Sequence, residues 1–257
     1  MSSRLAELGE CKDRDKLRIY GELIKANMHL IENGSKKAVV QNYYDEDLKS
    51  VEIPLNPTIS VSANTNNYFK EYKKSYTAEQ TLTKLIESDK KELLYLDSVL
   101  DNIARSTSVA DIDEIRKELN ATGYIKKQKQ NGHREKKSIN LKEYKSKEGY
   151  RIVVGKNNLQ NDYITTVLAK KNDIWFHVKG NAGSHVVVFC DGGNVSDETL
   201  AFAATLAAKN SKSANSSNVP VDYTSIKYVK KPSGAKPGMV IYTTNKTLFV
   251  TPKEEIL

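Results

Sequence analysis

A heptad pattern of apolar residues between Tyr68 and Ile103 restricts the fold of this chain more than any other feature. Steps of four and three residues from Tyr68 reach eight apolar or aromatic side chains among eleven positions. Such a seam predicts one long helix that packs against another helix along its length. The polar interruptions at Ser75, Glu79 and Asp89 would weaken a tight dimer, so they favour pairing within the chain.

The N-terminal residues supply the simplest partner for this long helix. Residues 2–33 predict a helix with a narrow apolar seam. The stretch "KKAVVQNYYDEDLKSVEIPL" follows and predicts a small β-hairpin, with strands at 38–43 and 51–55 around an acidic turn. We therefore expect an antiparallel coiled-coil arm over residues 1–125, with the hairpin between its two helices and a short helix at 109–119.

A strongly basic segment at 126–148 predicts the domain boundary. It holds nine lysines or arginines and few acidic residues, and so accounts for most of the net charge of +8. Without apolar periodicity, it is typical of a flexible or partly ordered linker. A solvated linker and a contact with a polyanion are both compatible with it, because each phosphate that a lysine neutralises releases counterions.

Residues 149–257 predict a compact α/β domain, so the whole chain belongs to the α/β (α+β) class. Helices are expected in "NNLQNDYITTVLAKK" and "DETLAFAATLAAKNSK", and "SANSSNVPVDYTS" is expected to be a loop. The last two strands are expected to join at a tight turn near Asn245. Strands are expected in "YRIVVGK", "DIWFHVK", "HVVVF", "IKYVKK", "MVIYTT" and "KTLFVTP".

Composition argues against several classes of protein. No run approaches the roughly 18 apolar residues of a membrane helix, and the first residues lack the apolar core of a signal peptide. Cys11 and Cys190 lie far apart, and no Cys/His cluster suggests zinc. We expect a cytoplasmic protein with no disulfide, metal, cofactor or membrane contact; surface display by an unconventional route is the alternative.

The stretch "NDIWFHVKGNAGSHVVVF" concentrates the residues that could carry chemistry. Alternation along a strand places Asp173, Trp175, His177 and Lys179 on one face, opposite the core. Trp175 is then either an anchor between sheet and helix or a platform on which bases stack. His177 and His185 are each either half-buried at a sheet edge or in contact with nucleic acid.

Two catalytic or metal-binding interpretations of this stretch are weaker. A Ser–His–Asp triad could combine Ser184 with His177 or His185 and Asp173, but "AGSHV" is not a nucleophile elbow. A metal site from the same histidines and aspartate would have few ligands, and no second cluster supports it.

Two further segments could bind phosphate. "GKNNLQND" places Lys156, Asn157, Asn158 and Asn161 around a helix start, where free N–H groups favour anions, although capping alone also explains them. The segment is not a Walker A loop. "IKYVKKPSGAKPG" holds lysines on a stiff Pro/Gly loop, which is either simply solvated or part of a positive surface.

The residues from "YRIVVGKNNLQNDYITTVLAKKNDIWFHVKGNAGSHVVV" through "VPVDYTSIKYVKKPSGAKPGMVIY" and "KTLFVTP" resemble the NFACT-R domain. That domain ends the proteins of the RqcH/NEMF family of ribosome quality control factors, whose bacterial members are often called fibronectin-binding proteins. "KLRIYGELIKANMHLIENGSKKAVVQNYYDEDLKSVEIPLNP" resembles the coiled-coil region before it. The resemblance covers nearly the whole chain, and Ala182 stands where the family usually has proline.

The resemblance implies a protein that binds the large ribosomal subunit and a tRNA, usually alanyl, during the C-terminal tailing of stalled nascent chains. The family's N-terminal domain, which holds most of the residues for tailing, is absent from this sequence, so binding rather than catalysis is expected. A fibronectin-binding adhesin and an RNA-cleaving enzyme that uses His177, His185 and Ser184 are the alternatives. The predicted RNA-binding residues are Lys156, Asn157, Asn158, Asn161, Asp173, His177, Lys179, Ser184, His185, Lys227, Lys230, Lys231 and Lys236.

Overall fold

The computed structural model describes residues 1–126 and 140–252 of the 257-residue chain. Contacts divide the chain into two compact units, Met1–Lys91 and Glu92–Leu257, and the division falls within the long helix α3 (Val61–Arg105). The domain boundary predicted at the basic segment 126–148 does not coincide with this division, and it stays a prediction. Most of that segment, residues 127–139, lies outside the described residues.

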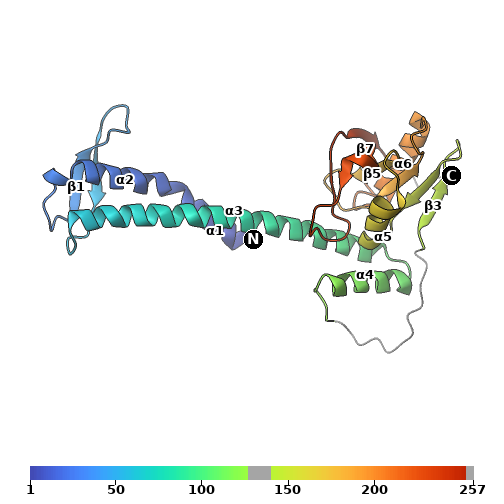
Figure 1. Ribbon diagram of the computed structural model, residues 1–257, viewed down its shortest axis with the longest axis horizontal. Helices are drawn as coiled ribbons and strands as arrows, with labels where there is room; N and C mark the ends of the chain where they lie inside the picture. Colours follow the sequence, from blue (N-terminus) through green and yellow to red (C-terminus); the bar gives the residue numbers. More distant parts are fainter. Residues whose placement is uncertain (127–139, 253–257) are drawn as a thin grey trace. The chain divides into compact units, whose positions relative to one another are not determined.

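The first unit is an antiparallel helical pair with a hairpin, as the heptad seam predicts. The N-terminal helices run back along the first part of α3, and the hairpin of β1 and β2 lies at the far end of the pair (Figure 1). Its elements are α1 (Ser2–Glu10), the 3₁₀ turn η1 (Cys11–Asp13), α2 (Arg14–Ala26), the 3₁₀ turn η2 (Met28–Leu30), β1 (Lys37–Gln41) and β2 (Ser50–Pro54).

The charged interruptions of the seam join the two arms of this pair. Arg14 of α2 forms an ion pair with Glu79, and Arg4 of α1 places its guanidinium 2.5 Å from the Asp89 carboxylate. The residues that disfavour a symmetric dimer are therefore the ones that pair α3 with its own N-terminal helices. Next to the hairpin the contact is apolar, with Leu23, Ile24, Ala38, Val40, Ile53, Leu55 and Val61 buried together.

Gly21 marks the closest approach of α2 to α3. A Cβ atom at Gly21 would lie 2.9 Å from Cε1 of Phe69, whereas a Cβ at Gly9 meets nothing within 4 Å. We expect Gly21→Leu to lower the free energy of unfolding by about 1–3 kcal/mol through overpacking. Gly9→Leu is the control, since it adds the same side chain to an exposed helix position; equal melting temperatures for the two variants would contradict this packing.

The second unit is built on a six-stranded sheet in which all neighbours are antiparallel. The order across the sheet is β10-β7-β5-β6-β4-β3, which puts β5 near the middle. The strands are β3 (Lys142–Lys145), β4 (Arg151–Val154), β5 (Ile174–Val178), β6 (Val186–Phe189), β7 (Val219–Ser225) and β10 (Lys246–Val250).

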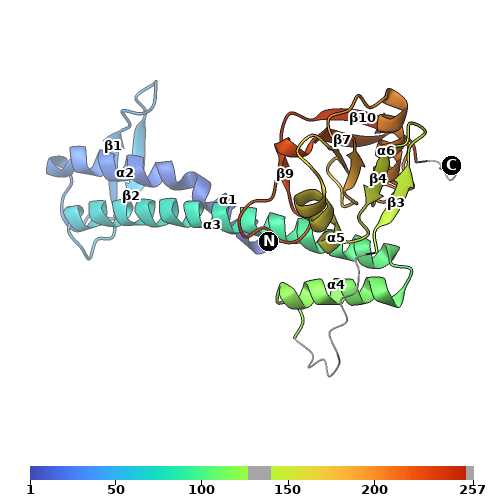
Figure 2. The same ribbon diagram turned by 45° about the vertical axis from the view of Figure 1, so that its right-hand side comes forward.

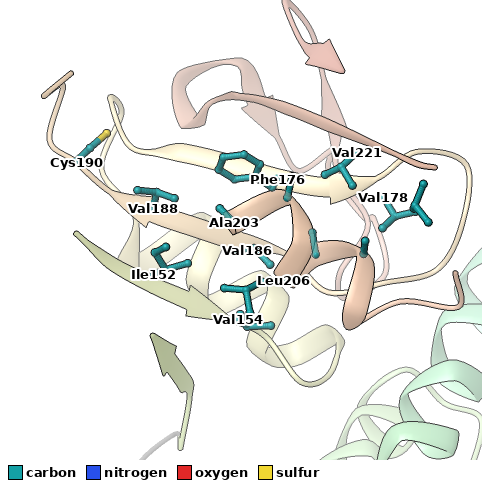
Figure 3. Packing of buried hydrophobic residues seen from close by; sticks show 14 residues of the cluster. Ile152, Val154, Phe176, Val178, Val186, Val188, Cys190, Ala203, Leu206 and Val221 are labelled. Carbon is teal, nitrogen blue, oxygen red and sulfur yellow. The ribbon is translucent and has the colours of Figure 1, made fainter. Parts of the chain in front are cut away.

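Both faces of this sheet are covered. The helix α6 (Asp197–Lys209) covers one face, where its alanines allow close approach to Phe176, Val186 and Val188 (Figure 3). The other face carries α5 (Asn158–Tyr163) and the π-helical segment η3 (Ile164–Leu168). The short hairpin of β8 (Val229–Lys230) and β9 (Ile241–Tyr242) also packs on that face, through Val229 and Tyr242.

Three details of the expected strand pattern are wrong. The predicted loop contains the strand β7, and the C-terminal part of the predicted linker is the edge strand β3. "MVIYTT" and "KTLFVTP" do not pair with each other, because β9 pairs with β8 and β10 pairs with β7. The sequence of β7 looks too polar for an inner strand because it contains Asp222 and Thr224. Both side chains are buried and have partners on other segments; Asp222 accepts hydrogen bonds from the hydroxyls of Tyr242 and Thr247.

The helix α4 (Val109–Ala121) packs against both the end of α3 and α5 (Figure 2). Ser108 and Asp111 form a capping box at its N-terminus, which satisfies backbone N–H groups that the helix leaves free. Tyr95, Val99 and Ile115 are buried between α3 and α4. None of the helices in the described parts of the chain is long and apolar enough to cross a membrane.

Candidate nucleic-acid interface

The polar face of β5 predicted from alternation is a second core rather than a surface. Trp175 is fully buried and packs with Val153, Ile164 and Val187 beneath α5 and η3. His177, the next residue on the same face, is half-buried. The alternation itself is correct, but the sheet has a layer on each side, so both faces of β5 are covered.

Three aromatic side chains form a compact cluster on this face. The rings of Trp175 and His177 stack, with centroids 5.7 Å apart and planes 13° apart. His185 places its ring edge-on to both, at 5.2 Å from Trp175 and 5.4 Å from His177. Its Nδ1 shares a hydrogen bond with Oγ1 of Thr165 at 2.7 Å.

Both imidazoles are uncharged at neutral pH. Burial lowers the pKa of His177 to about 4, because the surroundings penalise the charged ring. Burial also lowers the pKa of His185 well below its ordinary value, and a charge on neighbouring His177 would lower it further. Neither ring therefore adds positive charge for a phosphate group at neutral pH, and a contact with RNA would have to use a neutral imidazole.

A cavity of about 220 Å³ opens beside this cluster. The end of α3, the start of α5, the turn at 180–183 and the segment 238–242 form its walls. Trp175 lines the cavity, and its buried Nε1–H finds no hydrogen-bond acceptor in the described residues. Ala182 lies in the turn that borders it.

The asparagines at the start of α5 are buried under α4 instead of being open to an anion. Asn157 accepts a hydrogen bond from the backbone N–H of Gln160 as the helix cap, and its Nδ2 lies 2.6 Å from the Glu114 carboxylate. Asn158 donates to Glu118 at 3.0 Å and to Ser98 at 2.9 Å. Glu118 is itself fully buried, and burial raises the pKa of its carboxyl.

Asn161 and Ser184 are also occupied within the fold. The Oδ1 of Asn161 accepts from the backbone N–H of His185 at 3.0 Å, and only a glycine at 155 leaves room for it, since a Cβ there would lie 2.2 Å away. The hydroxyl of Ser184 accepts a hydrogen bond from Arg105 at 3.2 Å. The buried asparagines and Ser184 thus hold the segments together and do not face solvent.

Asp173 organises the backbone where β5 begins. Its Oδ1 accepts from the N–H groups of Cys190 and Asp191 at 3.0 and 2.9 Å, and its Oδ2 accepts from that of Lys170 at 2.8 Å. The side chain is almost completely buried. The carboxylate that a triad or a metal site would use thus accepts three backbone N–H groups, and no group of three potential metal ligands occurs in the described part of the chain.

The predicted lysines divide into engaged and exposed ones. Lys231 pairs with Asp162, Lys156 lies 3.9 Å from Asp111, and Lys179 lies 3.7 Å from Asp222. Lys236 places its ammonium over the rings of Tyr124 and Tyr95, at 4.6 and 5.4 Å. The two that remain exposed without an ion pair to the described residues are Lys227 and Lys230.

Comparison with protein families decides the relationship of this chain. The model of the NFACT N-terminal and middle domains matches residues 4–138, more than half of the chain. The chain belongs to the NFACT family. The model of the NFACT protein RNA binding domain matches residues 141–243 of this NFACT chain.

Curated relatives and a solved structure agree with this membership. The "Rqc2 homolog RqcH" of Bacillus subtilis (strain 168) is 43% identical over 239 residues, which cover 92% of this chain and 41% of the relative. That of Streptococcus suis (strain 05ZYH33) is 43% identical over 252 residues, 97% of this chain and 44% of the relative. The NFACT chain therefore spans less than half the length of these relatives.

The solved structure is that of the C-terminal part of the fibronectin/fibrinogen-binding protein from Streptococcus suis. It superposes with a TM-score of 0.76 at 37% identity, and the match covers 98% of this NFACT chain and 86% of that chain.

Sequence reasoning missed several residues of the site in this NFACT chain. Asp222 of β7 pairs with His177 of β5 and accepts a hydrogen bond from the Tyr242 hydroxyl. Burial together with the Asp222 carboxylate raises the pKa of Tyr242 to about 12. Lys171 lies next to Lys227, whose backbone N–H donates to the Lys171 carbonyl at 3.0 Å. Only the pairing of distant strands brings these residues together, so no local pattern signals them.

Proposed function

We propose that this chain is the RNA- and ribosome-binding part of a ribosome quality control factor. In this role it binds stalled large ribosomal subunits and tRNA in the cytoplasm, and so supports alanine tailing of nascent chains without a catalytic site of its own. The observation that carries the proposal is 43% identity with the Bacillus subtilis Rqc2 homolog RqcH over 92% of the chain. Because the chain spans 41% of that relative, we propose tailing for the longer protein and binding for this part.

The surface proposed for the RNA backbone is the η4–β8 patch, defined as Lys171, Lys227, Tyr228 and Lys230. The 3₁₀ turn η4 (Ile226–Tyr228) leads directly into β8, and all four side chains are exposed. The ammonium of Lys227 lies 5.0 Å from the centroid of the Tyr228 ring. Lysines beside an exposed aromatic ring suit a single strand, since phosphates meet the charge and bases can stack on the ring.

The buried members of the predicted set are left out of this surface. Asp173, Ser184, His185 and the three asparagines are at most 3% exposed, so they support the fold and are not part of this surface. Of the other predicted lysines, Lys231 and Lys179 border solvent and can add to the positive field.

Neutralising two lysines of the patch tests the proposal. For single strands each phosphate contact contributes about 0.7 to the slope of log affinity against log salt, so Lys227→Gln with Lys230→Gln should lower the slope by about 1.4. Affinity should fall at low salt, as measured by filter binding with single-stranded RNA. The matched control is Lys37→Gln with Lys49→Gln, which removes the same charge from the first unit.

The result that contradicts the RNA surface is an equal slope for the two double variants. Co-sedimentation with purified large ribosomal subunits tests the ribosomal part of the proposal, and the η4–β8 variant should pellet less than the control. If the wild-type chain stays in the supernatant with subunits that carry peptidyl-tRNA, the proposal fails.

Neither alternative gains support from the described residues. Fibronectin binding rests on the name of the Streptococcus suis protein alone. RNA cleavage would need Ser184 beside an imidazole, but its hydroxyl is bound to Arg105.

A further inference from the structure

The cavity beside Trp175 lies within the second unit; none of the lysines of the η4–β8 patch lines it, and backbone binding makes no use of it. It is bounded by Leu94, Asp97 and Ser98 of α3 on one side and by the 180–183 turn on another. Three features restrict which ligand the cavity can hold: its volume, the charge of its lining residues and one hydrogen-bond donor without an acceptor.

Size restricts the occupant to a single ring system. Pockets for drug-sized ligands have volumes of roughly 300–1,000 Å³, and this cavity has about 220 Å³. The aromatic side chains of Trp175, His177 and Tyr242 line it, and the ring centroids of Trp175 and Tyr242 lie 4.8 Å apart. A single heterocycle without its sugar and phosphate matches this size.

Charge excludes an anion as the group inside. Among the described residues that line the cavity, Asp97 is the only charged one; it lies 2.7 Å from the ammonium of Lys212, which is not on the walls, so its charge is balanced outside the cavity. Both imidazoles on the walls are neutral at pH 7. The walls therefore suit an uncharged polar ring, and any phosphate attached to it must stay at the surface.

The unsatisfied donor gives the ring an orientation. An unpaired N–H costs about 1–3 kcal/mol when buried, and such groups are rare in folded proteins. Trp175 lines the cavity, and its buried Nε1–H has no acceptor among the described residues. Ring nitrogens and exocyclic oxygens of nucleobases are acceptors that can satisfy it.

We propose that this cavity takes one unstacked base of a single-stranded RNA, while the phosphates of that strand remain on the protein surface. The inference rests on the proposed RNA-binding function and adds to it a site for a base. Extrusion of a single base is a known way for proteins to read or hold a strand, and its unstacking is least costly in RNA that is already single-stranded.

The test uses the fluorescence of Trp175, which is the only tryptophan of the chain. The full chain is titrated with a short single-stranded RNA and with the same backbone in which every nucleotide is abasic; filter binding is measured in parallel. We expect the intact RNA to quench Trp175 and the abasic strand to bind without quenching. Free adenosine, cytidine, guanosine and uridine form a third arm that shows whether a base unattached to RNA suffices.

A cavity-filling variant and a matched control complete the design. Ala182→Leu adds bulk to the cavity wall, and Ala214→Leu makes the same change at a half-buried alanine that is not on the wall. We expect Ala182→Leu to raise the dissociation constant obtained from Trp175 quenching by about tenfold, in line with the loss of one stacked base. Ala214→Leu should give the wild-type dissociation constant. The wild-type arms decide the matter even if Ala182→Leu fails to fold.

Each outcome separates this inference from the proposed function. RNA binding with unchanged Trp175 fluorescence, or equal quenching by intact and abasic strands, overturns the base site and leaves backbone binding in place. Absence of RNA binding removes both. Quenching by free nucleosides without RNA binding overturns the RNA source and assigns the cavity to a small heterocycle.

Discussion

Asp173→Asn is expected to lower the free energy of unfolding of the second unit by about 2–4 kcal/mol, because hydrogen bonds to a buried charged group are worth more than neutral ones. The carboxylate accepts three backbone N–H groups, from Lys170, Cys190 and Asp191. An asparagine has one acceptor oxygen, and its amide would direct an N–H toward another N–H. At least one buried donor is then left without a partner.

Chemical denaturation followed by Trp175 fluorescence measures this effect, since the tryptophan is two residues from the substitution. Asp191→Asn is the matched control: it makes the same chemical change on an exposed side chain whose φ of 48° asparagine tolerates. A shift of similar size in both variants would show that charge, and not the backbone contacts of Asp173, determines stability.

Acidification is expected to destabilise the second unit between about pH 6.5 and about pH 4. The unfolded chain binds a proton at each histidine near its ordinary pKa of about 6.5, whereas the folded chain keeps His177 neutral down to about 4. The unfolded state therefore binds more protons in this window, and stability falls as the pH falls. At about pH 5 the loss from His177 alone should be about 2 kcal/mol, and His185 acts in the same direction.

The variant His177→Gln isolates this contribution from the titration of carboxylates. Its free energy of unfolding should depend less on pH than that of the wild type in urea titrations across the window. His29→Gln, an exposed substitution in the first unit, is the control and should keep the wild-type dependence. Parallel pH profiles for wild type and His177→Gln would contradict the assigned burial of the imidazole.

The helical arm was predictable because its signal is local and long. A heptad seam repeats over many turns of one helix, and even its exceptions, Glu79 and Asp89, have partners in the N-terminal helices. The strand β7 was not predictable by the same means. Its polar residue Asp222 is buried because Tyr242 and Thr247 bring hydroxyls to it from other segments.

The candidate site shows the same limit. The sequence around Asn157 has the features of an anion-binding helix start, yet Glu114 from a helix more than 40 residues earlier already occupies its amide. Alternation in β5 gave the correct face for Trp175 but could not reveal the layer that covers it. Periodicity describes one element, whereas exposure depends on its neighbours.

The contacts between α4 and α5 have a practical consequence for dissecting the protein. The ranges matched by the two family models adjoin between residues 138 and 141. Glu114 and Glu118, before this junction, accept hydrogen bonds from Asn157, Asn158 and Gln160, after it. A recombinant fragment that begins at the junction would lack the partners of these amides. It would also lack the α3 residues that line the Trp175 cavity. An excised RNA-binding domain that is meant to fold should therefore start no later than Glu92.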